Sequence, residues 1–451
     1  MRPVLCLAVL LAVTPALAQY DFPVYETDKL PAVEYAPRRE AIRQKMVAGS
    51  IAFFFTNETM VRNNDVDFQF RGDSNFLYLT GFEEPDAVLV MAPAAFKVGD
   101  KMVKEVLFTN VADQGSITWL GYRMGPENVV KMLGIEHALS NREFAGSLPG
   151  MVEGKTAVYV SNAPAGGRDT LNTMNRAVSG WLASGNITPS REASGWLSTM
   201  RRIKSPAEIV LLKRASDISA RAHVEAMKTV RPGMREYEIG ALVEYFFKKE
   251  GCEFVGYPPI VGAGENSTIL HYQSLRKQMK AGEIICMDAA GEYHGYSSDV
   301  TRSFPVSGKF SAEQKAIYEV VLKAQEAGIA KCRSGVSVGA VGAACSDELA
   351  KGMIALGIIK APNELGRYYM HGFGHGIGLD VHDPMPGTLA PGATLTVEPG
   401  IYIKAGSPCD PKWWNIGIRI EDAILVTDGD PVNMSIACPR TVAEIERIMA
   451  R

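Results

Sequence analysis

Four acidic residues and one histidine have the types and spacing of metal ligands. They are Asp288, Asp299, His375, Glu398 and Glu421, in the segments ICMDAAGEYHGYSSDVTRSF, MHGFGHGIGLDVHD, LTVEPGIY and GIRIEDAIL. Four carboxylates and a single imidazole form a hard, negatively charged ligand set, which suits two divalent cations better than one. Without cations, such a cluster of buried carboxylates would have raised pKa values. The set predicts a hydrolase with two metal ions.

Five of the seven histidines lie between positions 271 and 382. A single histidine is more often structural than functional. The glycine-rich and acidic motifs nearby favour a role in the site for four of them: His271, His371, His375 and His382. We interpret His294 as structural because it lies in the polar turn EYHGY.

His371 and His375 have the spacing of a helical pair of ligands. However, four glycines between positions 372 and 378 make a helix costly there. We therefore expect a loop or extended backbone with close approach to a neighbouring segment.

Asp288 and Asp299 flank the turn GEYHG. If the hairpin is centred between Tyr293 and His294, the two acids are directly opposed, with side chains about 5 Å apart. They could then bind the same cation. The apolar segment EIICMDAA around Asp288 favours a buried pair over a solvent-facing one.

The other two acids also occur in strand-like segments. Glu398 precedes Pro399-Gly400, which would break a strand and can direct the side chain into a cleft. Glu421 shares strand parity with Arg419, which can orient a carboxylate or contact a substrate carbonyl or carboxylate. The alternative, a surface ion pair, fits poorly with the apolar GIRIEDAILV.

The length of 451 residues predicts two or three domains, and a hydrophobic content of 47% with 22% charged residues is typical of a globular protein. A net charge of −3 offers no basic field for nucleic acid. Residues 1–18, MRPVLCLAVLLAVTPALA, have the pattern of a signal peptide. The apolar run is too short for a stable membrane anchor. We expect export to a bacterial periplasm or medium.

Two domains are expected after the signal peptide, at 19–195 and 196–451. The first has strand-like runs separated by polar segments: SIAFFF, DAVLVMA, EVLFTN and TAVYVS. The second begins with a helix capped by Ser205, Pro206 and Glu208. A similar helix start at Ser311, roughly 100 positions later, indicates an internal duplication and a pseudo-symmetric domain. The predicted site lies at the interface of its two halves.

The order of the ligand motifs resembles the pita-bread metallopeptidases: Asp, a second Asp eleven positions later, His in HGxxHxxG, Glu in EPG and Glu in GIRIED. Within that group the chain is similar to aminopeptidase P, the Xaa-Pro aminopeptidases. FRGDSNFLYLTGFEEPDAVLV, ITWLG and IVGAGENSTILHY extend the similarity over nearly the whole chain after the predicted signal peptide.

The resemblance implies an α/β, creatinase-like N-terminal domain and an α+β pita-bread C-terminal catalytic domain. The catalytic domain would bind two Mn²⁺ ions, with Co²⁺ or Zn²⁺ as alternatives. Asp288 would bind one ion, Asp299 and Glu421 would bridge both, and His375 and Glu398 would complete the set. A metal-bridging hydroxide would attack the peptide bond after the first residue of a peptide with proline in second position.

The resemblance also assigns the remaining residues. Glu398 would be the general base and His382 would steady the scissile carbonyl. Four residues would shape the proline side of the site: His271, His371, Tyr402 and Arg419. Trp119, in ITWLG, would approach the substrate in a homo-oligomer, a dimer or tetramer.

Two alternatives remain open. A prolidase shares all five ligands but needs groups that bind the C-terminal carboxylate of a dipeptide. A non-enzymatic peptide-binding protein with the same fold typically lacks metal ligands, and none of the five is missing here.

Overall fold

The computed structural model describes residues 22–162, 170–185 and 187–450. The chain forms two compact units, 1–191 and 192–451. The predicted signal peptide lies outside the described residues, and the predicted domain boundary between 195 and 196 falls within α7 (Glu192–Arg201). No helix in the described part of the chain is both long and apolar enough to span a bilayer.

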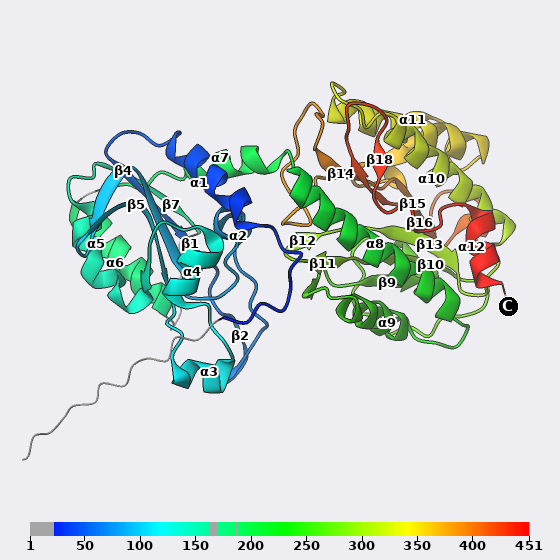
Figure 1. Ribbon diagram of the computed structural model, residues 1–451. Coiled ribbons are helices and arrows are strands. Elements are labelled where there is room, and N and C mark those ends of the chain that lie inside the picture. Colours follow the sequence, from blue (N-terminus) through cyan, green and yellow to red (C-terminus); the bar gives the residue numbers. More distant parts are fainter. Residues whose placement is uncertain (1–21, 163–169, 186, 451) are drawn as a thin grey trace, which may run out of the picture. The chain divides into compact units, whose positions relative to one another are not determined.

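The first unit is built on a mixed five-stranded sheet in the order β6-β5-β4-β1-β7 (Figure 1). The central strands β1, β4 and β5 are antiparallel, and the two edge strands pair parallel to their neighbours. The strands are β1 (Ser50–Phe55), β4 (Val88–Val98), β5 (Lys101–Thr109), β6 (Ala138–Ser140) and β7 (Ala157–Ser161). Four of them confirm the strands predicted from the apolar runs.

Aromatic side chains form much of the core of this unit. The rings of Phe108 and Phe144 meet edge to face with centroids 5.0 Å apart, and Phe53 also packs on Phe144. The remaining elements are α1 (Tyr35–Arg43), α2 (Ser74–Thr80), α3 (Gln114–Leu120), α4 (Gly125–Leu133), α5 (Phe144–Val152), α6 (Thr170–Gly185), β2 (Val61–Asn63) and β3 (Val66–Asp67), with short 3₁₀ turns η1 (Ala32–Glu34) and η2 (Asn141–Glu143).

The second unit contains two similar halves, as the internal duplication predicts. Each half has two long helices followed by paired strands: α8 (Pro206–Thr229) and α9 (Glu236–Lys249) in the first, α10 (Ala312–Ala330) and α11 (Val338–Ala355) in the second. The predicted capping box is present, since Ser205 accepts from the Glu208 N–H and Glu208 accepts from the Ser205 N–H. A final helix, α12 (Val442–Met449), follows the strands.

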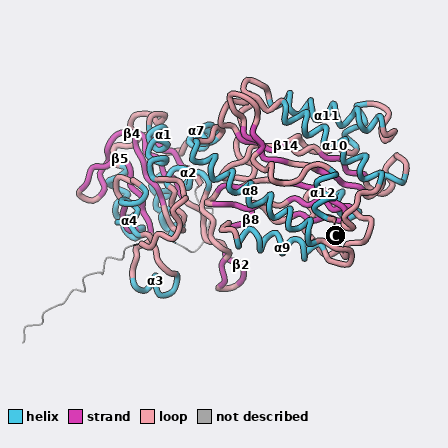
Figure 2. Tube along the Cα trace, turned by 45° about the vertical axis from the view of Figure 1, so that its right-hand side comes forward, coloured by secondary structure: helices cyan, strands magenta, loops and turns pink. Residues whose placement is uncertain are grey.

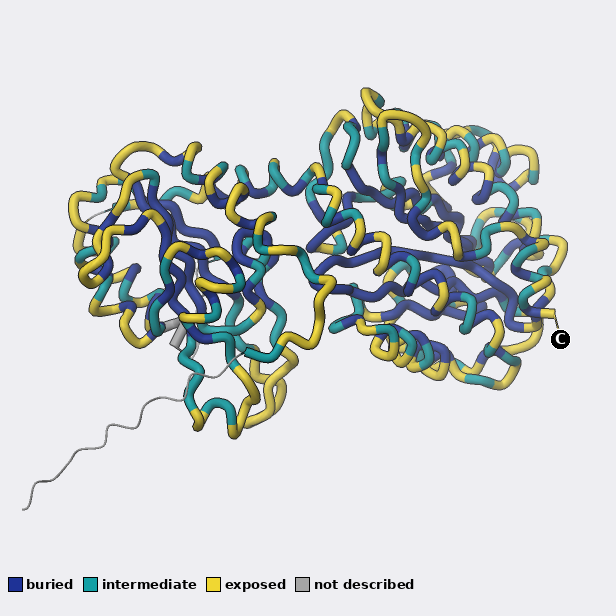
Figure 3. Tube along the Cα trace, viewed as in Figure 1, coloured by how far each residue is buried: buried dark blue, intermediate teal, exposed yellow. Residues whose placement is uncertain are grey.

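Most strands of this unit are buried, and the short strands β8 (Phe254–Val255) and β18 (Val432–Asn433) are the least buried (Figures 2 and 3). Those of the first half are β8 (Phe254–Val255), β9 (Ile260–Ala263), β10 (Ile284–Asp288), β11 (Gly291–Tyr293), β12 (Tyr296–Ser297) and β13 (Thr301–Pro305). Those of the second half are β14 (Thr394–Val397), β15 (Gly400–Ile403), β16 (Ile416–Arg419), β17 (Asp422–Leu425) and β18 (Val432–Asn433). Three 3₁₀ turns connect these elements: η3 (Gly264–Thr268), η4 (Pro362–Arg367) and η5 (Pro411–Trp413).

Candidate active site

The second unit contains a cavity of about 490 Å³, lined mostly by its loops and by residues at or between strand ends. All five predicted metal ligands line it: Asp288, Asp299, His375, Glu398 and Glu421. Four of the residues expected around the substrate also line it: His271, His371, His382 and Arg419. Tertiary structure therefore brings together residues spread over 150 positions of sequence.

The hairpin that carries the two aspartates has a different register from the predicted one. Asp288 pairs with Thr301, and Tyr293 pairs with Tyr296. The turn is a two-residue loop of His294 and Gly295, both with positive φ (49° and 82°), as in the turns that favour tight hairpins. The prediction that Asp288 and Asp299 are directly opposed is therefore wrong, because the turn lies one residue further along the chain.

Directly opposed acids occur in the second half instead. Val397 pairs with Asp422 and Gly400 pairs with Arg419. These two pairs have the same register, although the strand is interrupted between Val397 and Gly400. Glu398 therefore lies opposite Glu421. Each of these acids occupies the gap between two strands, where a side chain can turn toward the cavity.

Thr301 joins the two halves at the floor of the cavity. The N–H of Glu421 donates to the Thr301 carbonyl at 3.0 Å, and the Thr301 hydroxyl donates to Glu421 Oε2 at 2.6 Å. Thr301 is fully buried and Glu421 is 1% exposed. Only Oε2 of Glu421 is therefore occupied by the protein, and Oε1 is buried without a hydrogen-bond partner.

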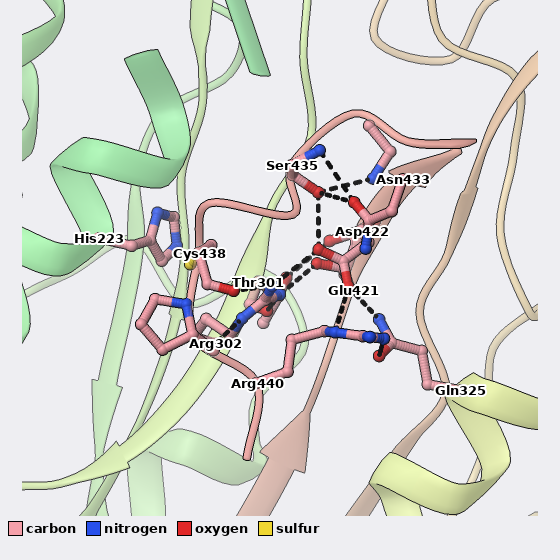
Figure 4. Close-up of polar contacts among 12 residues, drawn as sticks. His223, Thr301, Arg302, Gln325, Glu421, Asp422, Asn433, Ser435, Cys438 and Arg440 are labelled. Carbon is pink, nitrogen blue, oxygen red and sulfur yellow. Dashed lines mark hydrogen bonds and ion pairs between the residues drawn. The ribbon is translucent and has the colours of Figure 1, made fainter. Parts of the chain in front are cut away.

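A buried ion pair supports the backbone behind Glu421 (Figure 4). Arg302 donates to Asp422 Oδ1 at 2.7 Å and to the Glu421 carbonyl at 2.5 Å. Gln325 and Ser435 donate to the same Asp422 carboxylate at 3.0 and 2.6 Å. Because Arg302 and Asp422 are both fully buried, these contacts compensate charges that water cannot reach.

His375 reaches the acids from a loop, as the glycines predict. The His375 N–H donates to Thr396 Oγ1 at 3.0 Å, and a Cβ on Gly374 would lie 2.1 Å from the Thr396 carbonyl oxygen. His375 Nε2 lies 3.4 Å from Asp299 Oδ2 and 3.5 Å from Glu398 Oε1. The small glycines therefore allow the loop to approach β14 closely enough to place the imidazole among the acids.

The residues of the cavity fit a metal centre. The ligand atoms of Asp299, His375 and Glu421 all lie within 4.8 Å of one another. The unpartnered Oε1 of Glu421 is an acceptor that a cation would satisfy. An acid cluster of this kind binds hard divalent ions readily, because carboxylate oxygens are their preferred ligands.

The pKa values of the acids are raised because the acids are buried close to one another. Burial and the neighbouring acids raise the pKa of Asp299 above its usual value and that of Glu421 well above it. Burial also raises the pKa of Glu398 to about 7, against the lowering effect of the nearby cations His375 and Arg419. Ionising all of these groups together is therefore unfavourable without added positive charge.

The histidines differ in protonation. Burial opposes the charged form of His375, but its hydrogen bond to Asp299 and the charges of the acids raise its pKa to about 9. Burial and the Arg419 charge lower the pKa of His371 to about 4. Burial and the charge of His375 also lower the pKa of His382, whose ring centroid lies 4.0 Å from that of His375. His371 and His382 are therefore neutral near pH 7.

Arg419, in the cavity wall, and Tyr402, behind it, form a chain of hydrogen bonds. Arg419 donates to Asp288 Oδ2 at 2.7 Å and to the Tyr402 hydroxyl at 2.8 Å. The same hydroxyl lies 2.8 Å from His371 Nε2. Tyr402 is only 1% exposed and does not line the cavity, so it positions Arg419 and His371 from behind the wall. It would therefore shape the proline side of the site through these two residues.

Tyr257 is a residue that the sequence did not reveal. It lines the cavity, and its hydroxyl lies between Oδ1 of Asp288 and Oδ1 of Asp299. The Tyr257 hydroxyl therefore contacts both acids. It has one proton, so it can donate to only one of the two carboxylates at a time. Its segment, FVGYPPI, contains no acidic residue or histidine that could have indicated this role.

Trp119, the other predicted substrate residue, lies on α3 of the first unit. Its side chain is 87% exposed, and that of its neighbour Leu120 is 67% exposed. Its role at the site stays a prediction.

Residues 210–428 match metallopeptidase family M24, and residues 35–159 match the N-terminal domain of aminopeptidase P. The chain is 36% identical to the Xaa-Pro aminopeptidase of Escherichia coli K12 over 435 residues, 92% of this chain and 97% of the relative. It superposes on an aminopeptidase of Pseudomonas aeruginosa with a TM-score of 0.85 at 36% identity, covering 94% and 99% of the two chains. A zinc-substituted E. coli aminopeptidase P with product matches with a TM-score of 0.84 at 35% identity, covering 93% and 98%. These matches confirm the predicted fold class.

Proposed function

Because the chain belongs to metallopeptidase family M24 and carries the N-terminal domain of aminopeptidase P, we propose that it is a Xaa-Pro aminopeptidase. It would hydrolyse the bond between the first residue of a peptide and a proline in second position, the activity for which its relative from E. coli is named. The observation that carries the proposal is the convergence of all five ligand residues on one cavity that also contains three further histidines and an arginine.

The residues present fit two divalent cations. Asp288, Asp299, His375, Glu398 and Glu421 would hold them. The oxygen-rich set favours Mn²⁺, with Co²⁺ or Zn²⁺ as alternatives. When bound, the cations would supply a nucleophilic water near neutral pH.

The residues of the chain then have separate tasks. Glu398 accepts the proton of the attacking water, because it lines the cavity and lies opposite Glu421 in the strand register. His382, neutral and packed against His375 with the two rings tilted by 51°, steadies the scissile carbonyl by a hydrogen bond. His371 is fixed by the Tyr402 hydroxyl, which prevents it from rotating away from the cavity.

The proline side of the cavity combines apolar and polar groups. Pro258, Ile260, Leu270 and Val381 line the cavity with His271. Proline has no N–H to satisfy and a fixed φ, so an apolar wall of matching shape can select it by fit. We expect discrimination against alanine of about 10- to 200-fold, since an apolar pocket gives about 1–3 kcal/mol.

The arrangement of Arg419 favours the aminopeptidase over a prolidase. A dipeptidase must bind the C-terminal carboxylate of its substrate, and Arg419 is the arginine in the cavity wall. Its guanidinium is already hydrogen-bonded to Asp288, Tyr402 and Thr301. A non-enzymatic binding protein is disfavoured because every expected ligand residue lines the cavity.

We further propose that the protein is exported to a periplasm or the medium and acts as a dimer or tetramer. The signal-peptide pattern of residues 1–18 supports export. The exposed side chains of Trp119 and Leu120 support self-association, because large apolar side chains next to each other on a surface favour an interface.

One experiment tests the proposed activity. The Mn²⁺-loaded protein is incubated with Ala-Pro-Ala and Ala-Ala-Ala, and released alanine is quantified against the remaining peptides. We expect cleavage of the proline peptide before proline, faster than any cleavage of the control. Binding of both peptides without release would favour the peptide-binding alternative.

A further inference from the structure

His271 reaches the cavity from a segment that the core holds only weakly. The segment from Ala263 to Lys277 leaves β9, forms η3 and brings Leu270, His271 and Gln273 to the cavity wall. Its tip is exposed: Ile269 is 45% accessible, and His271 is also exposed. Because apolar burial does not fix the tip, its position must depend on polar contacts.

Glu236 supplies four polar contacts to this segment from outside the cavity. It is the first residue of α9, and its side chain is fully buried. Oε1 accepts from the Ala263 N–H at 3.0 Å and from Asn266 Nδ2 at 2.9 Å. Oε2 accepts from the Tyr272 hydroxyl at 2.8 Å and from the Lys277 N–H at 3.0 Å. One carboxylate thus binds both ends of the segment and the residue next to His271.

The start of α9 also donates hydrogen bonds to the segment, through its backbone N–H groups. The N–H groups of Glu236 and Tyr237 donate to the carbonyls of Lys277 and Leu275, at 3.1 and 3.0 Å. These are N–H groups of the first helical turn, which have no partner within their own helix. The positive end of the helix also favours the carboxylate at this position.

The same segment is fixed to the catalytic strands on its other side. The Gly417 N–H donates to Ser267 Oγ at 2.9 Å, and a Cβ on Gly417 would lie 2.0 Å from the Ser267 carbonyl oxygen. β16, which contains Gly417, ends at Arg419. Helix α9 and strand β16 therefore hold the base of the segment, and Tyr272 is the anchor nearest its exposed tip.

We propose that Glu236 is a positioning residue that sets the place of His271 at the cavity through Tyr272. Glu236 does not line the cavity and touches no predicted metal ligand through these contacts. Losing it should impair substrate binding more than the chemical step. The kinetic part of this inference rests on the proposed function; the structural part does not.

The decisive variant is Glu236→Gln. An amide has one oxygen and one NH₂ group, so whichever way it is turned, NH₂ faces one of the two backbone N–H groups, which cannot accept a hydrogen bond. The volume is kept, while the negative charge and the hydrogen bond to at least one end of the segment are lost. Tyr272→Phe removes the anchor next to His271 alone, and the double variant completes a cycle.

Glu208→Gln is the matched control. Glu208 is also a buried carboxylate in the first turn of a helix, and it accepts from the Ser205 N–H and from the Tyr296 hydroxyl. Both of these partners lie outside residues 263–277. A loss of stability that is merely structural should therefore affect this variant equally.

Hydrogen exchange tests the structural part in the whole protein without any substrate. Glu236→Gln should speed exchange of the amides in 263–277 at least about 10-fold, whereas Glu208→Gln should leave them unchanged. Unchanged exchange in Glu236→Gln would overturn the proposal, even if the wild-type protein cleaved no peptide.

Kinetics with Ala-Pro-Ala test the functional part. We expect a KM about 10-fold higher in Glu236→Gln, with kcat within about threefold of the wild type. The Glu236→Gln and Tyr272→Phe effects on KM should be less than additive, since one acts through the other. Additive effects, or an equal rise of KM in Glu208→Gln, would overturn the assignment to His271. Absence of cleavage by the wild type would instead contradict the proposed function.

Discussion

Thr301 and Glu421 bind each other through both backbone and side chain, across the line where the two halves of the catalytic unit meet. The backbone contact is 3.0 Å and the hydroxyl-to-carboxylate contact is 2.6 Å. One half therefore orients an acid of the other half. Thr301 fixes the orientation of this carboxylate through Oε2, and Oε1 stays buried without a hydrogen-bond partner.

Replacing Glu398 by glutamine should reduce kcat about 10²–10⁴-fold, because the amide keeps the shape but cannot accept a proton. Elemental analysis of the same sample should still find at least one metal ion. Glu326→Gln, which changes an exposed carboxylate on α10, serves as the control and should leave kcat unchanged. Near-normal turnover with two bound ions would contradict the role of Glu398.

Removing divalent cations with a chelator should abolish peptide cleavage, and Mn²⁺ or Co²⁺ should restore it. The physical reason is the oxygen-rich ligand set, in which no thiolate takes part. Elemental analysis and activity are measured on the same samples. Full activity in a sample shown to be free of metal would rule out the proposed chemistry.

Tripeptides with proline in second position should be cleaved faster than the corresponding dipeptides. The guanidinium of Arg419 is bound to Asp288 and Tyr402, so it is poorly placed to bind a dipeptide carboxylate. A longer peptide moves that carboxylate away from the acid cluster. The values of kcat/KM for Ala-Pro-Ala and Ala-Pro decide the question, and a higher value for the dipeptide would identify a prolidase.

Arg302→Met should lower the free energy of unfolding by about 3–5 kcal/mol, because the buried Asp422 charge loses its hydrogen-bonded guanidinium and keeps only Arg440, at 3.7 Å. Arg333→Met is the control: Arg333 also pairs with an aspartate, Asp430, but that side chain is 84% exposed. An exposed pair is worth at most about 1 kcal/mol. Urea denaturation measures the unfolding free energy of both variants. Equal losses would show that the buried pair contributes no more stability than the exposed pair.

His223 should make the fold less stable in acid. Burial lowers its pKa to about 4 from 6.5, so the folded protein holds this histidine neutral. Its contribution is therefore complete above pH 6.5 and is lost progressively as the pH falls from 6.5 toward 4. Between pH 6.5 and pH 5 the loss is about 2 kcal/mol.

The comparison variant is His223→Asn, whose amide can still donate to the Ser219 carbonyl that His223 Nδ1 approaches at 3.0 Å. Unfolding free energies of both proteins are measured by urea denaturation across this pH range. The wild type should lose more stability than the variant. Parallel pH curves would assign the acid sensitivity to other groups.

Local rules were enough to predict much of the fold. The capping box at Ser205 and Glu208 forms because side-chain oxygens satisfy helix N–H groups three residues away. The apolar run SIAFFF forms a strand that is buried at all six positions, because aromatic and β-branched side chains pack well on a pleated sheet. The glycines around His375 were correctly interpreted as a loop, because they are needed where that loop meets Thr396.

The ligand residues were also recognisable by type and order, but their geometry was not. The register of the aspartate hairpin depends on the positive φ of His294 and Gly295, which shifts the turn by one residue. A shift of this size changes which side chains are opposed. Opposed acids arose at Glu398 and Glu421, in the other half.

The sequence by itself determined which residues could bind metal ions and which segments would carry them, because those properties belong to single side chains and to short periodic patterns. Only the tertiary structure decided what surrounds them: Tyr257 between two aspartates, Tyr402 behind His371, and Glu236 beneath the segment of His271. These contacts join residues that are 31 to 42 positions apart in the sequence. Hydrogen bonds over such separations leave no local pattern, since they form only when the whole unit has folded.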